Sequence, residues 1–249
     1  NTRVENDDYV ATITYFSDAG GAVTLDLDDD DGIGSTILSG FDGTNTSSKI
    51  TGGDDGVVMT INAAAGNTGN DAFEFVGDIY ETSSSSTDLS ILKIGDGEQK
   101  LTGNINLASG SGDKGYINLA AGGLTLNPGS GETQVIEYLK GSAGTTLTLD
   151  STGSGTLELG FAETHSSSEA TFSGNVALTG SGASNIIKVS SGSTAADYSN
   201  EQVISGIISG SEKLSKSGVG RLKLTADNTF SGGMEINDGT VIAGHADAL

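Results

Sequence analysis

The sequence predicts an all-β protein built as a solenoid of short stacked strands. Runs that alternate apolar and polar residues recur along the whole chain, each bounded by Gly, Ser, Asn or Asp. Glycine supplies 39 of the 249 residues, enough to turn the chain every few residues. Helical patterns are almost absent. Aromatic residues make up only 5% of the chain and Trp is missing, so a bulky two-sheet sandwich core is not evident.

One unit repeats with variations: a glycine, one further residue, then two apolar residues separated by a polar one. Alternation with period two turns the apolar pair inward and leaves Thr, Asn, Glu and Lys outside. Copies or partial copies lie, in chain order, at 23–27, 103–107, 115–119, 124–126, 147–149, 155–159, 174–178 and 220–224. If a coil takes about 20 to 25 residues and adds one strand spacing, the chain makes about 10 to 12 coils.

The first hundred residues are less regular than the rest. Residues 1–100 carry most of the aromatic residues and the densest acidic runs, and we interpret them as a cap or as the first coils. Residues 101–249 are interpreted as regular coils. The segment 9–16 is typical of a strand and could cover the open end, where backbone groups would otherwise be unpaired. The best helical candidate, 132–139, is short and β-branched, so a strand fits it at least as well.

The charge excludes several classes of partner. Eleven Lys and Arg against 33 Asp and Glu give a net charge of −22, which repels nucleic acid and anionic membrane surfaces. No apolar run approaches the roughly 20 residues that span a bilayer. Without Cys the chain has neither a disulfide framework nor thiolate chemistry.

The sharpest charge cluster follows the first repeated unit and predicts a calcium site. Carboxylate oxygens at close spacing suit Ca²⁺, and the candidate ligands are Asp26, Asp28, Asp30 and Asp31. The EF-hand pattern fails, because counting from Asp26 the sixth place is not Gly and the twelfth is Ile37. The alternative is a solvated acidic turn. No other cofactor is expected.

Catalytic patterns are weak. His165 and His245 are the sole histidines, and neither stands in a pattern that indicates a Ser-His-Asp triad. With 33 acidic residues some carboxylates must lie close together by chance, and the aromatic and basic residues that usually accompany sugar-cleaving pairs are few and scattered. We therefore expect a protein that is not an enzyme.

A family resemblance appears in residues 206–249. Residues 216–224 read K-S-G-V-G-R-L-K-L, and they are followed by N-T-F-S-G-G at 228–233, I-N-D-G-T-V at 236–241 and G-H-A-D-A-L at 244–249. This stretch resembles the passenger-associated repeat of bacterial autotransporters. It departs at Met234 and Glu235, where Thr is usual, and at His245 and Asp247, where Asn is usual. We expect Asn228 to bond backbone at a coil corner, Gly232 and Gly233 to form a tight corner, and Ile236, Val241 and Leu249 to fill the interior.

The resemblance implies a right-handed parallel β-helix that is exported and displayed or released outside a bacterial cell. It also implies a translocator barrel, the one route to the membrane, which has no counterpart in this sequence, so we expect a piece of a longer protein. The expected function is a non-enzymatic stalk that presents loops for adhesion to host or neighbouring-cell surface molecules. The alternatives are a self-assembling subunit of a filament or aggregation factor, whose partner is another copy of the chain, and a β-helical polysaccharide-active enzyme.

Overall fold

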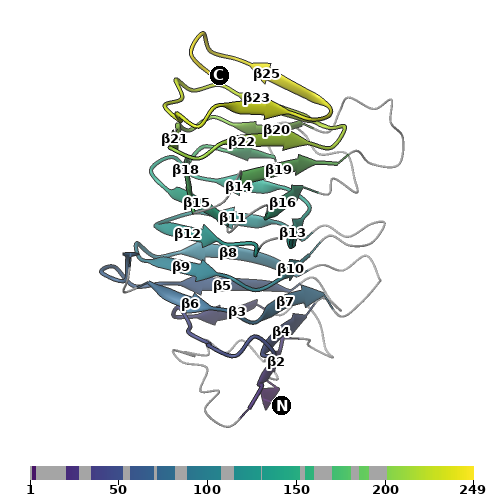
Figure 1. Ribbon diagram of the computed structural model, residues 1–249. Coiled ribbons are helices and arrows are strands. Elements are labelled where there is room, and N and C mark those ends of the chain that lie inside the picture. Colours follow the sequence, from purple (N-terminus) through teal and green to yellow (C-terminus); the bar gives the residue numbers. More distant parts are fainter. Residues whose placement is uncertain are drawn as a thin grey trace.

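The chain folds into a stack of coils whose strands form three parallel sheets, as the computed structural model shows (Figure 1). The structure describes residues 2–3, 21–27, 35–52, 57–69, 72–81, 89–107, 115–129, 131–151, 155–159, 170–180, 185–190 and 201–249. Every strand pairing in this part of the chain is parallel, and each strand inside a sheet pairs with its counterparts in the coils before and after it. The predicted β-solenoid is therefore confirmed.

The sheets, which we call A, B and C, contain ten, nine and six strands. Sheet A consists of β1 (Thr2–Arg3), β2 (Thr24–Asp26), β4 (Lys49–Gly52), β7 (Asp78–Glu81), β10 (Ile105–Asn106), β13 (Thr133–Ile136), β16 (Thr156–Leu159), β19 (Asn185–Val189), β22 (Leu214–Ser217) and β24 (Met234–Ile236). Sheet B consists of β3 (Ser35–Leu38), β5 (Val58–Asn62), β8 (Ser90–Ile94), β11 (Ile117–Leu119), β14 (Leu139–Gly141), β17 (Thr171–Phe172), β20 (Glu201–Ile204), β23 (Arg221–Leu224) and β25 (Thr240–Ala243). Sheet C consists of β6 (Phe73–Phe75), β9 (Glu98–Leu101), β12 (Gly123–Leu126), β15 (Thr146–Ser151), β18 (Asn175–Gly180) and β21 (Ile208–Gly210).

The coils differ in length more than we expected. Ser173 and Ser205 bond across neighbouring coils at a separation of 32 residues, whereas Ser215 and Glu235 do so at 20. The longest connections from β7 to β20 all run from sheet A to sheet B: they are residues 82–89, 107–116, 160–170 and 190–200. The ambiguous segment 132–139 forms strands rather than a helix, in β13 and the start of β14.

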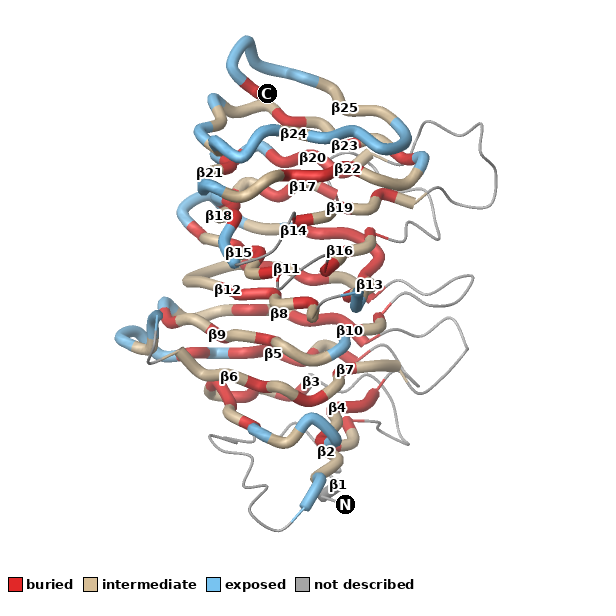
Figure 2. The backbone as a smooth tube through the Cα atoms, in the orientation of Figure 1, coloured by how far each residue is buried: buried red, intermediate tan, exposed pale blue. Residues whose placement is uncertain are grey.

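One continuous apolar core runs up the inside of the stack (Figure 2). In-register pairing places the inward residue of each strand over the inward residue of the strand below, as in the column Leu126, Leu149 and Leu178 of sheet C. The apolar pairs predicted from the repeated unit are buried, among them Ile105, Leu107, Ile117, Leu119, Leu157, Leu159, Leu222 and Leu224. A small residue in a column is matched by a large neighbour, because the ring of Phe172 occupies the space where Gly141 lacks a Cβ.

Lysine does not stay outside, contrary to our expectation. Lys93 takes the inward place of β8 between Ile61 and Leu119, and Lys216 takes that of β22 between Ile187 and Ile236. Both side chains are fully buried. The inward columns also hold Gln99, Gln134 and Gln202. Residue type alone misassigns these positions, because backbone groups inside the corners can satisfy a buried polar head.

Two of the three residues predicted to fill the terminal interior do not. Ile236 is 53% exposed and Leu249 is 65% exposed, whereas Val241 packs partly buried against the core. The reason is position: β24 and β25 are the outermost strands of sheets A and B among the described residues, so nothing described covers their outer side. Ala248, rather than Leu249, is the buried residue of the last turn.

Candidate functional site

The predicted calcium site is only partly within the described residues. Asp26 lies at the end of β2, and its Oδ1 accepts a hydrogen bond from the Thr51 hydroxyl of the next coil at 3.1 Å. This bond ties two coils together and is the contact that a solvated acidic strand end would make. Asp28, Asp30 and Asp31 lie outside the described residues. The calcium site stays a prediction.

A groove of about 420 Å³ lies at the corner between sheets C and A. Its wall includes the hydroxyls of Thr44, Thr46 and Thr102 and the carboxylates of Asp78 and Glu132. Both carboxylates are held locally. Asp78 accepts bonds from the backbone and side-chain nitrogens of Asn104 at 3.1 and 3.2 Å, and Glu132 accepts one from the backbone N–H of Gly129. The arrangement offers polar contacts for a neutral, hydroxyl-rich ligand.

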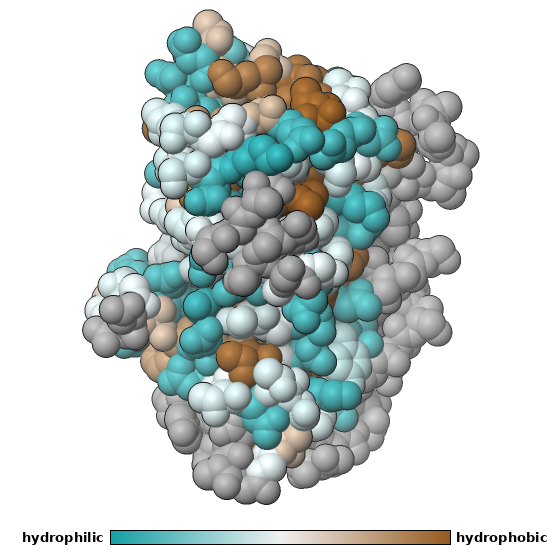
Figure 3. Space-filling model, in the orientation of Figure 1, coloured by the Kyte–Doolittle hydropathy of each residue, from teal (hydrophilic) through white to brown (hydrophobic). Residues whose placement is uncertain are grey.

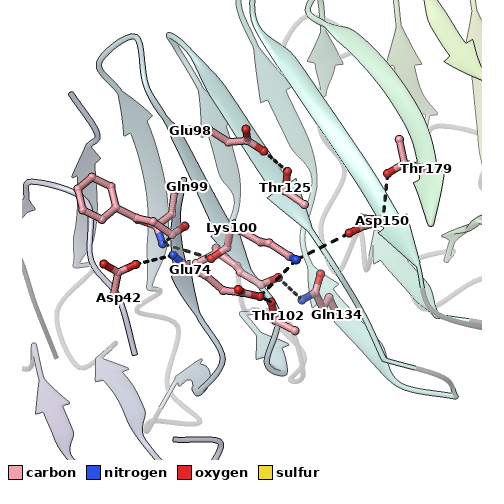
Figure 4. A network of polar contacts seen from close by, with 12 residues as sticks. Asp42, Glu74, Glu98, Gln99, Lys100, Thr102, Thr125, Gln134, Asp150 and Thr179 are labelled. Carbon is pink, nitrogen blue, oxygen red and sulfur yellow. Dashed lines mark hydrogen bonds and ion pairs between the residues drawn. The ribbon is translucent and has the colours of Figure 1, made fainter. Parts of the chain in front are cut away.

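Sheet C carries a ladder of polar contacts on its outer face (Figure 4). Lys100 of β9 lies 3.3 Å from Glu74 of β6 and 3.9 Å from Asp150 of β15. Thr102 donates to the same Glu74, and Thr179 donates to Asp150. Each contact joins different coils, so the ladder fastens the stack rather than gathering groups around a reacting atom.

A group with metal-ligand chemistry lies in the last turns. Ligand atoms of Asp227, His245 and Asp247 all lie within 4.8 Å of one another, and all three residues are exposed. The Nδ1 of His245 already accepts the backbone N–H of Asp247 at 3.2 Å. The sequence presented His245 and Asp247 as departures from the repeat, and His245 as a histidine without a triad pattern, although their spacing within G-H-A-D-A indicates this proximity. His165 lies outside the described residues.

The most strongly built polar sites are the two buried lysines. Lys93 donates to the carbonyls of Ile94, Gly95 and Gly97 at 2.8 to 2.9 Å. Lys216 donates to the carbonyls of Ser217 and Gly218, at 2.6 Å for the latter. Burial lowers the pKa of Lys93 to about 8, against the attraction of Asp96 and Glu98, and it lowers the pKa of Lys216 to about 8, against that of Asp238.

The terminal coils have the remaining predicted corner contacts. The side chain of Asn228 accepts the backbone N–H of Ile208 at 2.8 Å and donates to the carbonyl of Ala248 at 2.7 Å. It thereby links the coil below to the last turn, as expected for a corner asparagine. Gly233 has a positive φ of 81°, and a Cβ on Gly232 would lie 2.2 Å from the carbonyl carbon of Glu212.

The terminal coils are also the part of the chain that matches a known family. Residues 214–243, which form β22 to β25, match the family model described as passenger-associated-transport-repeat. The chain carries an autotransporter passenger repeat. Such a repeat implies a secreted or cell-surface protein. Comparison with curated proteins and with solved structures found no match. Among the described residues no helix is long and apolar enough to cross a membrane.

Proposed function

We propose that this chain is a non-enzymatic, extracellular passenger segment of an autotransporter-like adhesin, which holds its sheet A to sheet B connections toward surface molecules of other cells. One observation carries the proposal. The passenger repeat is not a separate appendage: β22 and β23 pair in register with β19 and β20, so the repeat continues sheets A and B of the same stack.

The stack supplies both stiffness and a side for contact. Ten strands in sheet A, about 4.8 Å apart, give a column about 45 Å long with one core. The strands that precede the long connections, β7, β10, β16 and β19, end at the same edge of sheet A, because they are parallel and in register. A large net negative charge keeps the surface soluble and opposes unspecific contact with nucleic acid.

Binding to cells tests the proposal. The purified chain is incubated with host and bacterial cells, and bound protein is compared with that of variants whose sheet A to sheet B connections, 160–170 and 190–200, are each shortened to two residues. The natural connection between β13 and β14, residues 137–138, shows that two residues suffice at this corner.

The matched control shortens residues 63–72, which join sheet B to sheet C. We expect cell binding to fall in the first two variants and to persist in the control, with the β-sheet circular dichroism spectrum unchanged in all three. Unaltered binding in the first two variants, or turnover of a glycan that Asp78→Asn or Glu132→Gln abolishes, would overturn the proposal.

Self-association is a second candidate, favoured by the end of the stack. Figure 3 shows hydrophobic surface gathered near the C-terminal end, and the exposed large apolar residues include Ile207, Val219, Ile236 and Leu249. The outer edges of β24 and β25 could pair with another copy. The joint expected at residues 9–16 lies outside the described residues.

Light scattering over a concentration series distinguishes this candidate. Self-association predicts a mass that rises with concentration in the natural chain and in Ile207→Lys, but not in Ile236→Lys, because only Ile236 lies on the outermost strand of sheet A. A mass that stays that of one chain at every concentration rejects self-association.

A further inference from the structure

Two stretches far apart in the chain share a local sequence. Residues 93–102 read K-I-G-D-G-E-Q-K-L-T and residues 216–225 read K-S-G-V-G-R-L-K-L-T, which agree at six of ten places. The family match covers the second stretch but not the first. They also occupy different corners, because Lys93 ends in the turn from sheet B to sheet C and Lys216 in the turn from sheet A to sheet B.

Both stretches form the same local structure, a cup of backbone carbonyls around a lysine ammonium group. The lysine side chain points into the stack and curls back, so that its ammonium group meets the carbonyls of the residues that follow it. The two glycines of K-x-G-x-G shape the turn, and the first has a positive φ in each copy: 75° at Gly95 and 71° at Gly218. Carbonyl groups at a buried corner would otherwise lack donors.

The coil above adds one further carbonyl to each cup. Lys93 Nζ reaches the carbonyl of Ala121 at 3.3 Å, and Lys216 Nζ reaches that of Asp238, also at 3.3 Å. The next residue is a glycine with positive φ in both cases, Gly122 at 68° and Gly239 at 72°.

Neither of these glycines has room for a side chain. A Cβ on Gly122 would lie 2.4 Å from the carbonyl oxygens of Gly95 and Gly97, and a Cβ on Gly239 would lie 2.3 and 2.5 Å from those of Gly218 and Gly220. The close approach of the two coils therefore depends on glycine at this place.

We infer that the chain carries one lysine clamp twice, and that each clamp fastens its coil to the next by sharing the ammonium donors of Lys93 or Lys216 between the corner carbonyls of both coils. Residues 93–97 with 121–122 form the internal clamp, and residues 216–220 with 238–239 form the terminal clamp. An ammonium group has three N–H donors, and in the terminal clamp all three have acceptors only when the last coil is in place.

The docking of the last coil depends on both halves of the terminal clamp, the ammonium group of Lys216 and the carbonyl of Asp238. If the carbonyl of Asp238 is displaced while the last coil stays docked, Lys216 keeps a buried charge with an unused donor, which is costly. Without Lys216, the carbonyls of Ser217, Gly218 and Asp238 lose their common partner. The two halves of the clamp are therefore coupled, and loss of one half removes most of what the other contributes.

Hydrogen exchange on the full chain tests the terminal clamp, because β24 and β25 can open without unfolding the stack. The variants are Lys216→Met, Gly239→Ala and both together. We expect amides of residues 234–243 to exchange about tenfold faster in either single variant, and little faster again in the double variant. Amides of β15 should not change.

Two controls separate the clamp from ordinary damage to the coil. Lys223→Met removes a lysine on the outer face of β23 and should leave exchange unchanged. Gly233→Ala strains another positive-φ glycine, but a Cβ there would have nothing within 4 Å, so its effect should multiply with that of Lys216→Met. The inference is overturned if Lys216→Met and Gly239→Ala also multiply, or if Lys216→Met leaves exchange at residues 234–243 unchanged.

The internal clamp is tested by urea unfolding of Lys93→Met beside Lys140→Met, since Lys140 is exposed. A lower midpoint for Lys93→Met, or no folded protein, is expected while Lys140→Met unfolds like the natural chain. Equal midpoints for Lys93→Met and the natural chain would show that residues 93–97 do not form a second lysine clamp.

Discussion

The body of the solenoid and its terminal repeat use the same stacking with different coils. In the body, from β4 to β21, each coil contributes a strand to all three sheets and can exceed 30 residues. In the repeat, β22 to β25 contribute only to sheets A and B, and neighbouring coils are 19 or 20 residues apart. Pairing remains parallel and in register throughout. Coil length is therefore free to vary at the corners, provided that inward residues meet inward residues.

The two regions differ in how their side chains are held. Body positions are covered by coils on both sides, whereas the last coil is covered on one side by described residues. There, polar contacts replace burial: Lys213 of the coil below pairs with Glu235, and its hydrogen bond and charge lower the pKa of that carboxyl. This pair is exposed, so it contributes little to stability.

The largest expected loss of stability comes from a substitution in the body of the solenoid. Phe172→Ala removes a fully buried ring that also fills the space beside Gly141 and Gly174. A cavity of this kind costs about 3 to 5 kcal/mol. Urea unfolding should show this loss, and the comparison fails if Phe172→Ala costs no more than a substitution in the last coil.

A buried amide bridges coils that are not neighbours, and its loss should have the next largest effect. The side chain of Gln202 accepts the N–H of Leu139 at 3.0 Å and donates to its carbonyl at 2.9 Å, two coils below, because β17 starts too late to pair there. Gln202→Leu would leave these buried groups without a partner and should cost about 2 kcal/mol or more. Gln202→Glu serves as a second variant, since it keeps the acceptor but loses the donor. A midpoint unchanged in Gln202→Leu would show that the bridge is dispensable.

Alkaline pH should increase what the buried lysines contribute to stability, in the body and in the repeat alike. The pKa of Lys93 and of Lys216 is about 8 in the folded chain and about 10.4 in the unfolded chain. Between these values the unfolded chain binds more protons, so the free energy of unfolding contributed by these lysines rises with pH. Because other groups also titrate, the measurement is the difference between the natural chain and Lys216→Met at pH 7.5, 8.5 and 9.5. That difference should grow with pH, and a flat difference would contradict the lowered pKa.

The smallest effect is expected at the end of the stack. Ile236→Ala truncates a side chain that is 53% exposed on the outermost strand, so it should change stability by about 0.5 kcal/mol or less. The inward residue at the same place one coil below is Lys216, and two coils below it is Ile187. Ile187→Ala should cost several times more in the same urea experiment. Equal costs would mean that the last coil is covered in solution.

The sequence predicted much of the fold but little of the polar interior. Alternation identified Leu157 and Leu159 as inward residues, because neighbours on a strand must point to opposite faces. The same rule could not place Lys93 or Lys216, since charged residues in an alternating run are ordinarily read as the outer face. The groove at Asp78 and Glu132 was also beyond sequence reasoning. Its residues come from different coils. Because the coils vary from 19 to 32 residues in length, no fixed period in the sequence predicts which distant positions lie side by side.

By itself, the sequence determined the class of fold and the passenger repeat, because alternation, glycine frequency and the K-x-G-x-G-x-L-x-L stretch are local properties. The tertiary structure decided everything that depends on which coil lies above which. It placed the lysines in carbonyl cups, let Gln202 reach Leu139 beside the short strand β17, and left Ile236 on the outermost strand of sheet A. The physical reason is that the burial and the hydrogen-bond partners of a residue depend on the neighbouring coils, and the register between coils is fixed only when they stack.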